Sequence, residues 1–288
     1  MFMDYKKLTN AFKIPVIGLG TWGIGGFMKA DSSKDKENIQ AIKDAIELGY
    51  SHIDTAEIYG AGHTEKLIGN AIKDLDRSKI IITNKVFKTN LKYNDVIASC
   101  KKSLEKLQTN FIDIYLIHAP NSKIPLEETI GALDYLVDQK MIKFIGVSNF
   151  SVEQMQEAQK YTKNKIVANQ IPYNLATRNK DYKENCINME SKIIPYCQAN
   201  DIIVIACRPI ERGFLLKPNS LLDNLSEKYG KTKTQIAINW LVSKKNIITI
   251  PKSTSLNHLK ENLGSIGWSL TPDDIKLLDE TEFESPTD

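Results

Sequence analysis

The chain has no apolar run that approaches the roughly 18 residues a transmembrane helix requires, and its first ten residues are too polar for a secretory signal peptide. Its four cysteines show no Cys-x-x-Cys spacing, so we expect free thiols in a reducing compartment rather than disulfides or a zinc site. The 38 basic and 35 acidic residues are spread along the chain, without the basic block that a nucleic acid or a membrane surface would attract. These absences predict a cytoplasmic protein with no metal site and no nucleic-acid or membrane partner.

The chain does contain a series of short, almost wholly apolar runs. Six are clear and two weaker ones fall in the gaps: 16–19, 51–53, 80–82, 114–117, 144–147, 166–168, 202–206 and 247–250. Strands that are apolar on both faces belong to parallel sheets covered by helices. Helical patterns lie between the runs, with Ile39, Ile42 and Ile46 on one helix face and capping boxes that begin at Ser151 and Thr232. Eight alternating units predict an α/β fold, the (β/α)8 TIM barrel, although periodicity alone leaves an open doubly wound sheet as an alternative.

No linker, low-complexity segment or charge run divides the 288 residues, so we expect a single barrel domain over residues 1–288. Residues from about 5 to 16 are expected to form a β-hairpin that caps the bottom of the barrel. Few residues follow the last predicted helix, which opens at Thr271 and Pro272, so we expect the tail to add little to any pocket wall. We expect a monomer or a weak oligomer.

Polar residues stand at the ends of most of the predicted strands. In TIM barrels the carboxyl ends of the strands meet at the face that carries the active site. The residues that share this position are Asp54, Lys85, His118, Ser148, Asn149, Gln170, Arg208, Lys252 and Ser253. One such residue alone is usually a solvated loop residue, but the recurrence at seven strand ends predicts a functional site.

The segments around these positions resemble the aldo-keto reductase family, in its prokaryotic type with a short C-terminal tail. The matching segments occur in order at 49–60, 81–86, 113–120, 146–150, 169–170 and 250–253. The likeness runs from about residue 5 to 281, and it is specific because no single motif carries it. It implies a barrel enzyme that reduces aldehydes and ketones reversibly to alcohols, with hydride from a nicotinamide cofactor and a proton from Tyr59.

The chemistry of four residues agrees with this implication. A tyrosine phenol has a pKa near 10, and a nearby ammonium can lower that pKa, so we expect Lys85, held by Asp54, to make Tyr59 acidic. His118 would orient the carbonyl oxygen and donate a hydrogen bond to it. Each residue alone also has a structural interpretation, as an ion pair, a half-buried tyrosine or a satisfied core histidine. Together they predict a catalytic site.

The resemblance also implies the cofactor contacts. Ser148, Asn149 and Gln170 would hold the carboxamide. Lys252, Ser253, Thr254 and His258 would surround the 2′-phosphate, with Glu261 and Asn262 at the adenine. The rest of the cleft would be lined by Gly20, Thr21, Asp54, Cys207, Arg208, Pro209 and Ile210. Trp22, Tyr59 and His118 would surround a small carbonyl substrate. NADPH is the expected cofactor, and NADH stays open because Cys207 and His258 replace an aromatic residue and an arginine common in the family.

Three alternatives compete with this interpretation. Residues 18–23 match the G-x-G-x-x-G pattern of a Rossmann fold, but a polar loop separates them from the next helix. A barrel that binds NADPH as a sensor or an assembly subunit, with little turnover, would have the same fold. A metal-dependent hydrolase would need more ligands than His52 and Asp54, and we expect His52 to point away from the site.

Overall fold

The computed structural model describes residues 3–178, 180–181 and 186–283. Its central feature is a sheet of eight strands in which neighbours in sequence are also neighbours in space, each pair being parallel. The strands are β3 (Leu19–Gly20), β4 (His52–Asp54), β5 (Ile81–Val86), β6 (Ile112–Ile117), β7 (Ile142–Ser148), β8 (Ile166–Pro172), β9 (Ile203–Cys207) and β10 (Ile247–Thr249). All eight predicted runs contribute to these strands, so the predicted alternation is confirmed.

The sheet closes on itself between its first and last strands. Ile17 forms a parallel bridge with Thr249, and the amide of Gly18 donates to the carbonyl of Thr249 at 2.8 Å. At Gly20 a Cβ atom would clash with the carbonyl oxygen of Ile250, so glycine allows the two backbones to approach at this seam. Closure excludes the open doubly wound sheet and confirms the (β/α)8 barrel.

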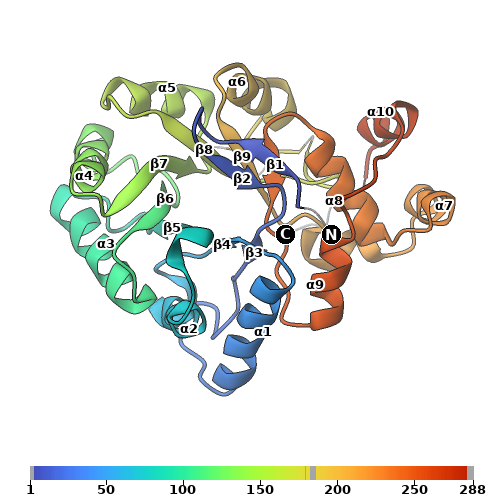
Figure 1. The fold of residues 1–288 in the computed structure, drawn as a ribbon. Coiled ribbons are helices and arrows are strands. Elements are labelled where there is room, and N and C mark those ends of the chain that lie inside the picture. The colour runs from blue at the N-terminus through green and yellow to red at the C-terminus, as the bar shows by residue number, and fades with distance from the viewer. Residues whose placement is uncertain (1–2, 179, 182–185, 284–288) are drawn as a thin grey trace.

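Helices surround the strands as an outer ring (Figure 1). They are α1 (Asp35–Glu47), α2 (His63–Ile72), α3 (Tyr93–Leu107), α4 (Leu126–Asp138), α5 (Val152–Lys160), α6 (Ile194–Ala199), α7 (Ser220–Tyr229), α8 (Lys233–Ser243), α9 (Leu256–Leu263) and α10 (Pro272–Glu280). The capping boxes predicted at Ser151 and Thr232 are present at the starts of α5 and α8. Because α1 begins only at Asp35, no helix follows the glycines at 18–23 directly, and the Rossmann interpretation is wrong.

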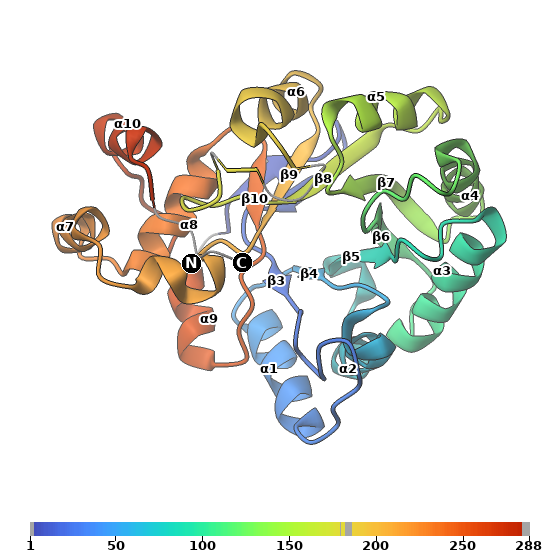
Figure 2. The same ribbon diagram turned by 180° about the vertical axis from the view of Figure 1, so that it is seen from behind.

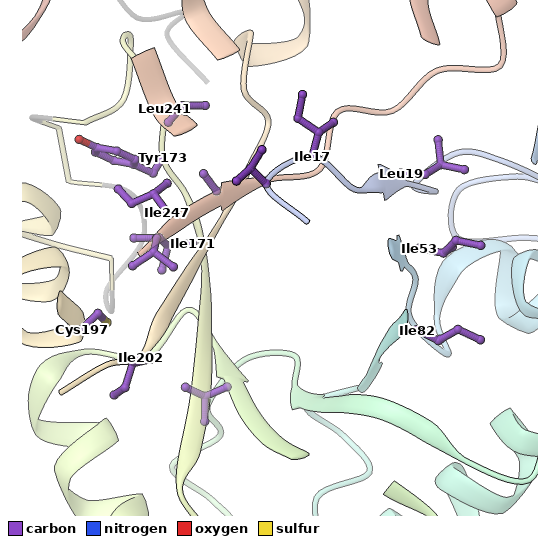
Figure 3. Packing of buried hydrophobic residues seen from close by; sticks show 14 of the residues in the cluster. Ile17, Leu19, Ile53, Ile82, Ile171, Tyr173, Cys197, Ile202, Leu241 and Ile247 are labelled. Atoms are coloured by element: carbon purple, nitrogen blue, oxygen red, sulfur yellow. The ribbon is translucent and has the colours of Figure 1, made fainter. Parts of the chain in front are cut away.

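Two apolar layers hold the barrel together. The outer layer lies between strands and helices, and Figure 3 shows Leu19, Ile53 and Ile82 pointing outward from three neighbouring strands. The inner layer fills the barrel with residues such as Ile114 and Ile205. Alternation along each strand therefore turns every second side chain inward, and this is the side that holds the functional residues at the carboxyl ends.

His52 lies two residues before Asp54 on β4 and faces the barrel interior, where its Nε2 is 2.9 Å from the hydroxyl of Thr83. A Cβ at Gly18 would come within 2.5 Å of the imidazole, so the glycine makes room for the ring. Burial lowers the pKa of His52 to about 3, which keeps the ring neutral. His52 lies on the same side of β4 as Asp54 but one layer deeper, and it is not among the residues that line the cavity described below.

An antiparallel hairpin of β1 (Tyr5–Lys7) and β2 (Lys13–Pro15) covers the amino ends of the strands. Phe12 in its turn packs against Phe144 near the start of β7, with ring centroids 5.2 Å apart. The hairpin lies in front of the strands in Figure 1, and Figure 2 shows the opposite face, where the strands end. This arrangement leaves the carboxyl-end face for a site.

Cys100, Cys186, Cys197 and Cys207 are all free thiols. Among the residues that the structure describes, none of the helices combines the length and apolar character needed to cross a membrane. Residues 284–288, to which the expectation of a short tail refers, lie outside the described residues.

Candidate active site

The site is built around a buried ion pair at the ends of β4 and β5. Nζ of Lys85 lies 2.6 Å from Oδ1 of Asp54, donates to the carbonyl of Thr55 at 2.7 Å, and is 3.4 Å from the hydroxyl of Tyr59. The Lys85 and Asp54 side chains are 0% and 2% exposed. Burial is the largest single effect on Lys85 and lowers its pKa, but Asp54 and Tyr59 together act in the opposite direction and raise the pKa of the lysine above its usual value. The ammonium is therefore held charged next to the phenol.

Tyr59 belongs to a tight turn (η1, Tyr59–Gly62) between β4 and α2, and its side chain is buried. Burial raises the pKa of the phenol to about 12, although Lys85 pulls in the opposite direction. The expectation that Lys85 makes Tyr59 more acidic than an ordinary tyrosine is therefore wrong, because the loss of hydration is the larger effect. The phenol stays protonated across the physiological range and is available as a proton donor.

His118 follows β6 directly and completes the centre. Its ring is 5.9 Å from that of Tyr59, centroid to centroid, and also 5.9 Å from that of Phe87. The carbonyl of His118 accepts a hydrogen bond of 3.0 Å from the side chain of Asn149. The imidazole thus lies beside the phenol where both rings border the same cavity.

These groups open into a cavity of about 670 Å³, a size typical of small-molecule and cofactor sites. Most of the predicted site residues line it: Gly20, Thr21, Trp22, Asp54, Tyr59, His118, Ser148, Asn149, Gln170, Cys207, Arg208, Pro209, Ile210, Lys252, His258, Glu261 and Asn262. Lys85 lies beneath it, in contact with Tyr59. Ser253 and Thr254 do not line it: the hydroxyl of Ser253 accepts from the amide of Ser255 at 3.0 Å, and Thr254 is exposed. Their contact with a phosphate stays a prediction.

One side of the cavity is polar, and we call it the polar wall. It consists of Ser148, Asn149, Gln170, Arg208, Lys252 and His258. Gln170 donates to Oδ2 of Asp54 at 2.7 Å, which fixes the carboxylate from the side opposite Lys85. Asn149 has a positive φ of 60°, a backbone conformation that asparagine tolerates better than most residues, and its amide reaches the hydroxyl of Ser148 at 2.9 Å.

Cys207 ends β9 and borders the polar wall. Burial raises the pKa of its thiol to about 11, so the group is a neutral thiol at physiological pH and a poor nucleophile. Cys207 therefore contributes a small, uncharged side chain to the cavity lining.

The other side of the cavity is apolar, and we call it the apolar lip. Its residues come from the segments after β3, β4 and β5: Trp22, Phe27, Met28, Ile58 and Phe87. Phe27 reaches the site through Trp22, with ring centroids 5.5 Å apart, and Trp22 packs edge-on against Tyr59 at 4.8 Å. Only Trp22 of this lip was predicted from the sequence.

Further cavity residues were also missed. They are Pro172, Arg212, Gly213, Leu216, Thr234, Ile238, Ile250 and Pro251. Arg212 and Leu216 come from the short helix η4 (Glu211–Leu216), which follows β9. Of these missed residues, Arg212 could have been proposed from the sequence, because it is a charged residue that closely follows Arg208 in the segment after β9.

Comparison with known proteins shows which family the chain belongs to. The sequence profile of the Aldo/keto reductase family matches residues 16–282. The chain belongs to this family. It is 32% identical to a methylglyoxal reductase (YeaE) of Escherichia coli strain K12, over 95% of this chain and 93% of that protein. It is 31% identical to a glyoxal reductase of Bacillus subtilis strain 168, over 96% of this chain and 92% of that protein.

Solved structures of the family share the fold. The thermostable aldo-keto reductase Tm1743, solved with the inhibitor epalrestat, superposes with a TM-score of 0.90 at 41% identity, covering 96% of this chain and 99% of that one. An aldo-keto reductase from Klebsiella pneumoniae in complex with NADPH gives a TM-score of 0.86 at 28% identity, covering 97% and 95%. The chain therefore shares its full architecture with these family members.

Proposed function

We propose that this chain reduces aldehydes and ketones to alcohols with NADPH as its preferred hydride donor. The observation that carries the proposal is the buried Asp54–Lys85–Tyr59 arrangement that opens beside His118 into a cavity of about 670 Å³. Family membership and the reductase names of the relatives support the reaction class.

The cavity fits a nicotinamide dinucleotide in its chemistry. The polar wall offers amide and hydroxyl groups from Ser148, Asn149 and Gln170 for a carboxamide. Lys252 and His258 stand exposed at one edge, where they suit a phosphate group. Such a cofactor would supply the hydride, which no protein side chain can provide. A preference for NADPH over NADH rests on Lys252 in particular, because its ammonium can pair with the additional phosphate.

The side chains of the protein would complete the reduction. His118 and Tyr59 would hold the carbonyl oxygen by hydrogen bonds, and Tyr59 would donate its proton as negative charge develops on that oxygen. An alkoxide is a much stronger base than a phenolate, so the transfer is favourable even from a phenol with a pKa of about 12. Lys85 would stabilise the phenolate that remains, and Asp54 and Gln170 hold the charges in place.

The test is to follow the oxidation of NADPH, and separately of NADH, with methylglyoxal, glyceraldehyde, xylose and an aromatic aldehyde. We expect aldehyde-dependent turnover that falls by at least about 100-fold in Tyr59→Phe, the usual size of a general-acid contribution. Tyr93→Phe, at the exposed start of α3, is the matched control and should keep the activity. NADPH binding without turnover of any aldehyde would favour the cofactor-sensing alternative instead.

A further inference from the structure

A buried carboxylate lies outside the cavity, in the helix that follows the turn of Tyr59. Glu65 stands in the first turn of α2, its side chain is 0% exposed, and it does not line the cavity. Burying a carboxylate is costly unless hydrogen bonds and an opposite charge compensate for the lost hydration. Both carboxylate oxygens of Glu65 have such partners, and these partners lie next to Lys85 and next to the turn of Tyr59.

The first partner of Glu65 is Asn84 on β5, which is buried. The side-chain amide of Asn84 donates to Oε1 of Glu65 at 2.7 Å, and Oδ1 of Asn84 accepts from the backbone amide of Lys85 at 2.8 Å. Because side chains alternate along a strand, Asn84 faces the helices while Lys85 faces the barrel interior. Two consecutive hydrogen bonds therefore connect Glu65 to the backbone that carries the Lys85 ammonium.

The second partner is Lys106 near the end of α3, the helix beside α2 in the outer ring (Figure 1). Its Nζ lies 3.3 Å from Oε2 of Glu65. The lysine side chain passes directly over Gly62, where an added Cβ atom would clash with Nζ and Cε of Lys106. Gly62 ends the turn η1, which begins at Tyr59. The ion pair therefore holds the lysine side chain against the turn that carries the proton donor.

The backbone of this turn needs support from its surroundings. Gly60, Ala61 and Gly62 have positive φ values of 55°, 52° and 88°. The left-handed conformation is unfavourable for Ala61, which has a Cβ atom, so neighbouring contacts have to hold it. The hydroxyl of Tyr59 is 3.4 Å from Nζ of Lys85, and a displacement of about 1 Å is enough to slow a reaction by about 100-fold.

We infer that Glu65 is a positioning residue for proton transfer, because it holds the turn of Tyr59 in place relative to Lys85. It acts from the layer between strands and helices and touches neither the substrate nor the cofactor. This inference rests on the proposed reductase function and goes beyond it by adding a residue outside the cavity. Loss of Glu65 should therefore slow reduction and leave the affinity for NADPH unchanged.

The first experiment measures the single-turnover rate of aldehyde reduction and the Kd for NADPH. In Glu65→Met, which removes both interactions at similar side-chain size, the rate should fall by at least about tenfold while the Kd stays unchanged. Glu65→Gln and Lys106→Met remove only the ion pair and keep the acceptor for Asn84, so the rate should fall by no more than about fivefold. An unchanged rate in all three variants would overturn the inference.

Asp113 provides the matched control. It is also a buried carboxylate, 2% exposed, and it forms ion pairs of 2.8 Å with Arg77 and Lys143. It lies near the start of β6, at the end of the barrel opposite the cavity. Asp113→Asn should lower the free energy of unfolding and leave the single-turnover rate unchanged. A loss of rate as large as that in Glu65→Met would show general destabilisation and would overturn the inference.

The second experiment tests whether Glu65 acts through Tyr59. Once the phenol is absent its position no longer matters, so Glu65→Met should not lower the residual single-turnover rate of Tyr59→Phe any further. Lys106→Met, whose side chain is 26% exposed, provides the same comparison if Glu65→Met does not fold. An equal loss of rate with and without the phenol would overturn the positioning role alone. No turnover of any aldehyde by the unsubstituted protein would overturn the proposed reductase function as well.

Discussion

The two sides of the cavity differ in the side chains that they present. The apolar lip, from the segments after β3, β4 and β5, offers rings and alkyl groups. The polar wall, from β7, β8 and the segments after β9 and β10, offers hydroxyl, amide and cationic groups. The hydrogen bond of 2.7 Å from Gln170 to Asp54 joins the two halves of the barrel beneath the cavity.

This difference suggests that the polar wall binds the cofactor and that the apolar lip contacts the substrate. A charged, hydrogen-bonding cofactor needs fixed polar partners, whereas a variable apolar substrate needs surface without hydrogen-bonding demands. The proton donor belongs to the apolar half, and burial there keeps Tyr59 protonated. Substitutions in the polar wall should therefore affect cofactor binding, and substitutions in the apolar lip should affect the substrate. Substitutions at the junction of the two sides, the Asp54–Lys85–Tyr59 group, should affect the reaction itself.

The largest expected effect is at the junction, in Lys85→Met. Removing one partner of a buried ion pair leaves the Asp54 carboxylate uncompensated, which costs about 3–5 kcal/mol of unfolding free energy. The phenolate of Tyr59 also loses its stabilising charge, so kcat should fall by at least about 100-fold. Denaturant unfolding and steady-state kinetics measure the two effects.

The double variant Asp54→Asn/Lys85→Met separates stability from chemistry. It removes both charges, so it should recover much of the lost unfolding free energy while kcat stays low. Recovery of kcat together with stability would contradict the role given to Lys85 beside Tyr59.

A second effect concerns pH and needs no substitution. Reduction uses the protonated phenol, and with a pKa of about 12 for Tyr59 its protonated fraction hardly changes between about pH 6 and about pH 9. Alcohol oxidation uses the phenolate, whose fraction rises about tenfold per pH unit below that pKa. Single-turnover rates should therefore be flat for reduction and rise steeply for oxidation. A reduction rate that falls near neutral pH would show that the phenol is far more acidic than its burial implies.

Substitutions in the polar wall should change the affinity for the cofactor and leave the chemistry at Tyr59 unchanged. Lys252→Met removes an exposed cation at the cavity edge, and we expect NADPH affinity to fall by about tenfold while NADH affinity stays unchanged. Lys260→Met, a cation on α9 outside the cavity lining, is the control. Fluorescence titration with both cofactors measures the outcome, and an equal loss for NADH would place Lys252 away from the additional phosphate.

The polar wall was far easier to predict from the sequence than the apolar lip. Ser148 ends β7, and Asn149 and Arg208 directly follow β7 and β9. Strand ends converge in a barrel whatever the loops do. Phe27 and Met28 lie in an irregular loop, and the backbone there is held by a hydrogen bond from the amide of Gly60 to the carbonyl of Phe27 that no periodic pattern encodes. The raised pKa of Tyr59 was also missed, because the balance between burial and a neighbouring charge depends on packing around the ring.

The smallest expected effect is at Arg212, on a segment that belongs to neither side by composition, since η4 contributes both Arg212 and the apolar Leu216 to the cavity. Among the described residues Arg212 makes no ion pair, and its backbone has a φ of 54°. An exposed cation gives a phosphate only about 0.2–1 kcal/mol. In Arg212→Met the Kd for NADPH should therefore rise by no more than about fivefold, and the rise should disappear at high salt. If the KM for the aldehyde rises instead while the Kd for NADPH is unchanged, η4 contacts the substrate rather than the cofactor, although it follows a strand that contributes to the polar wall.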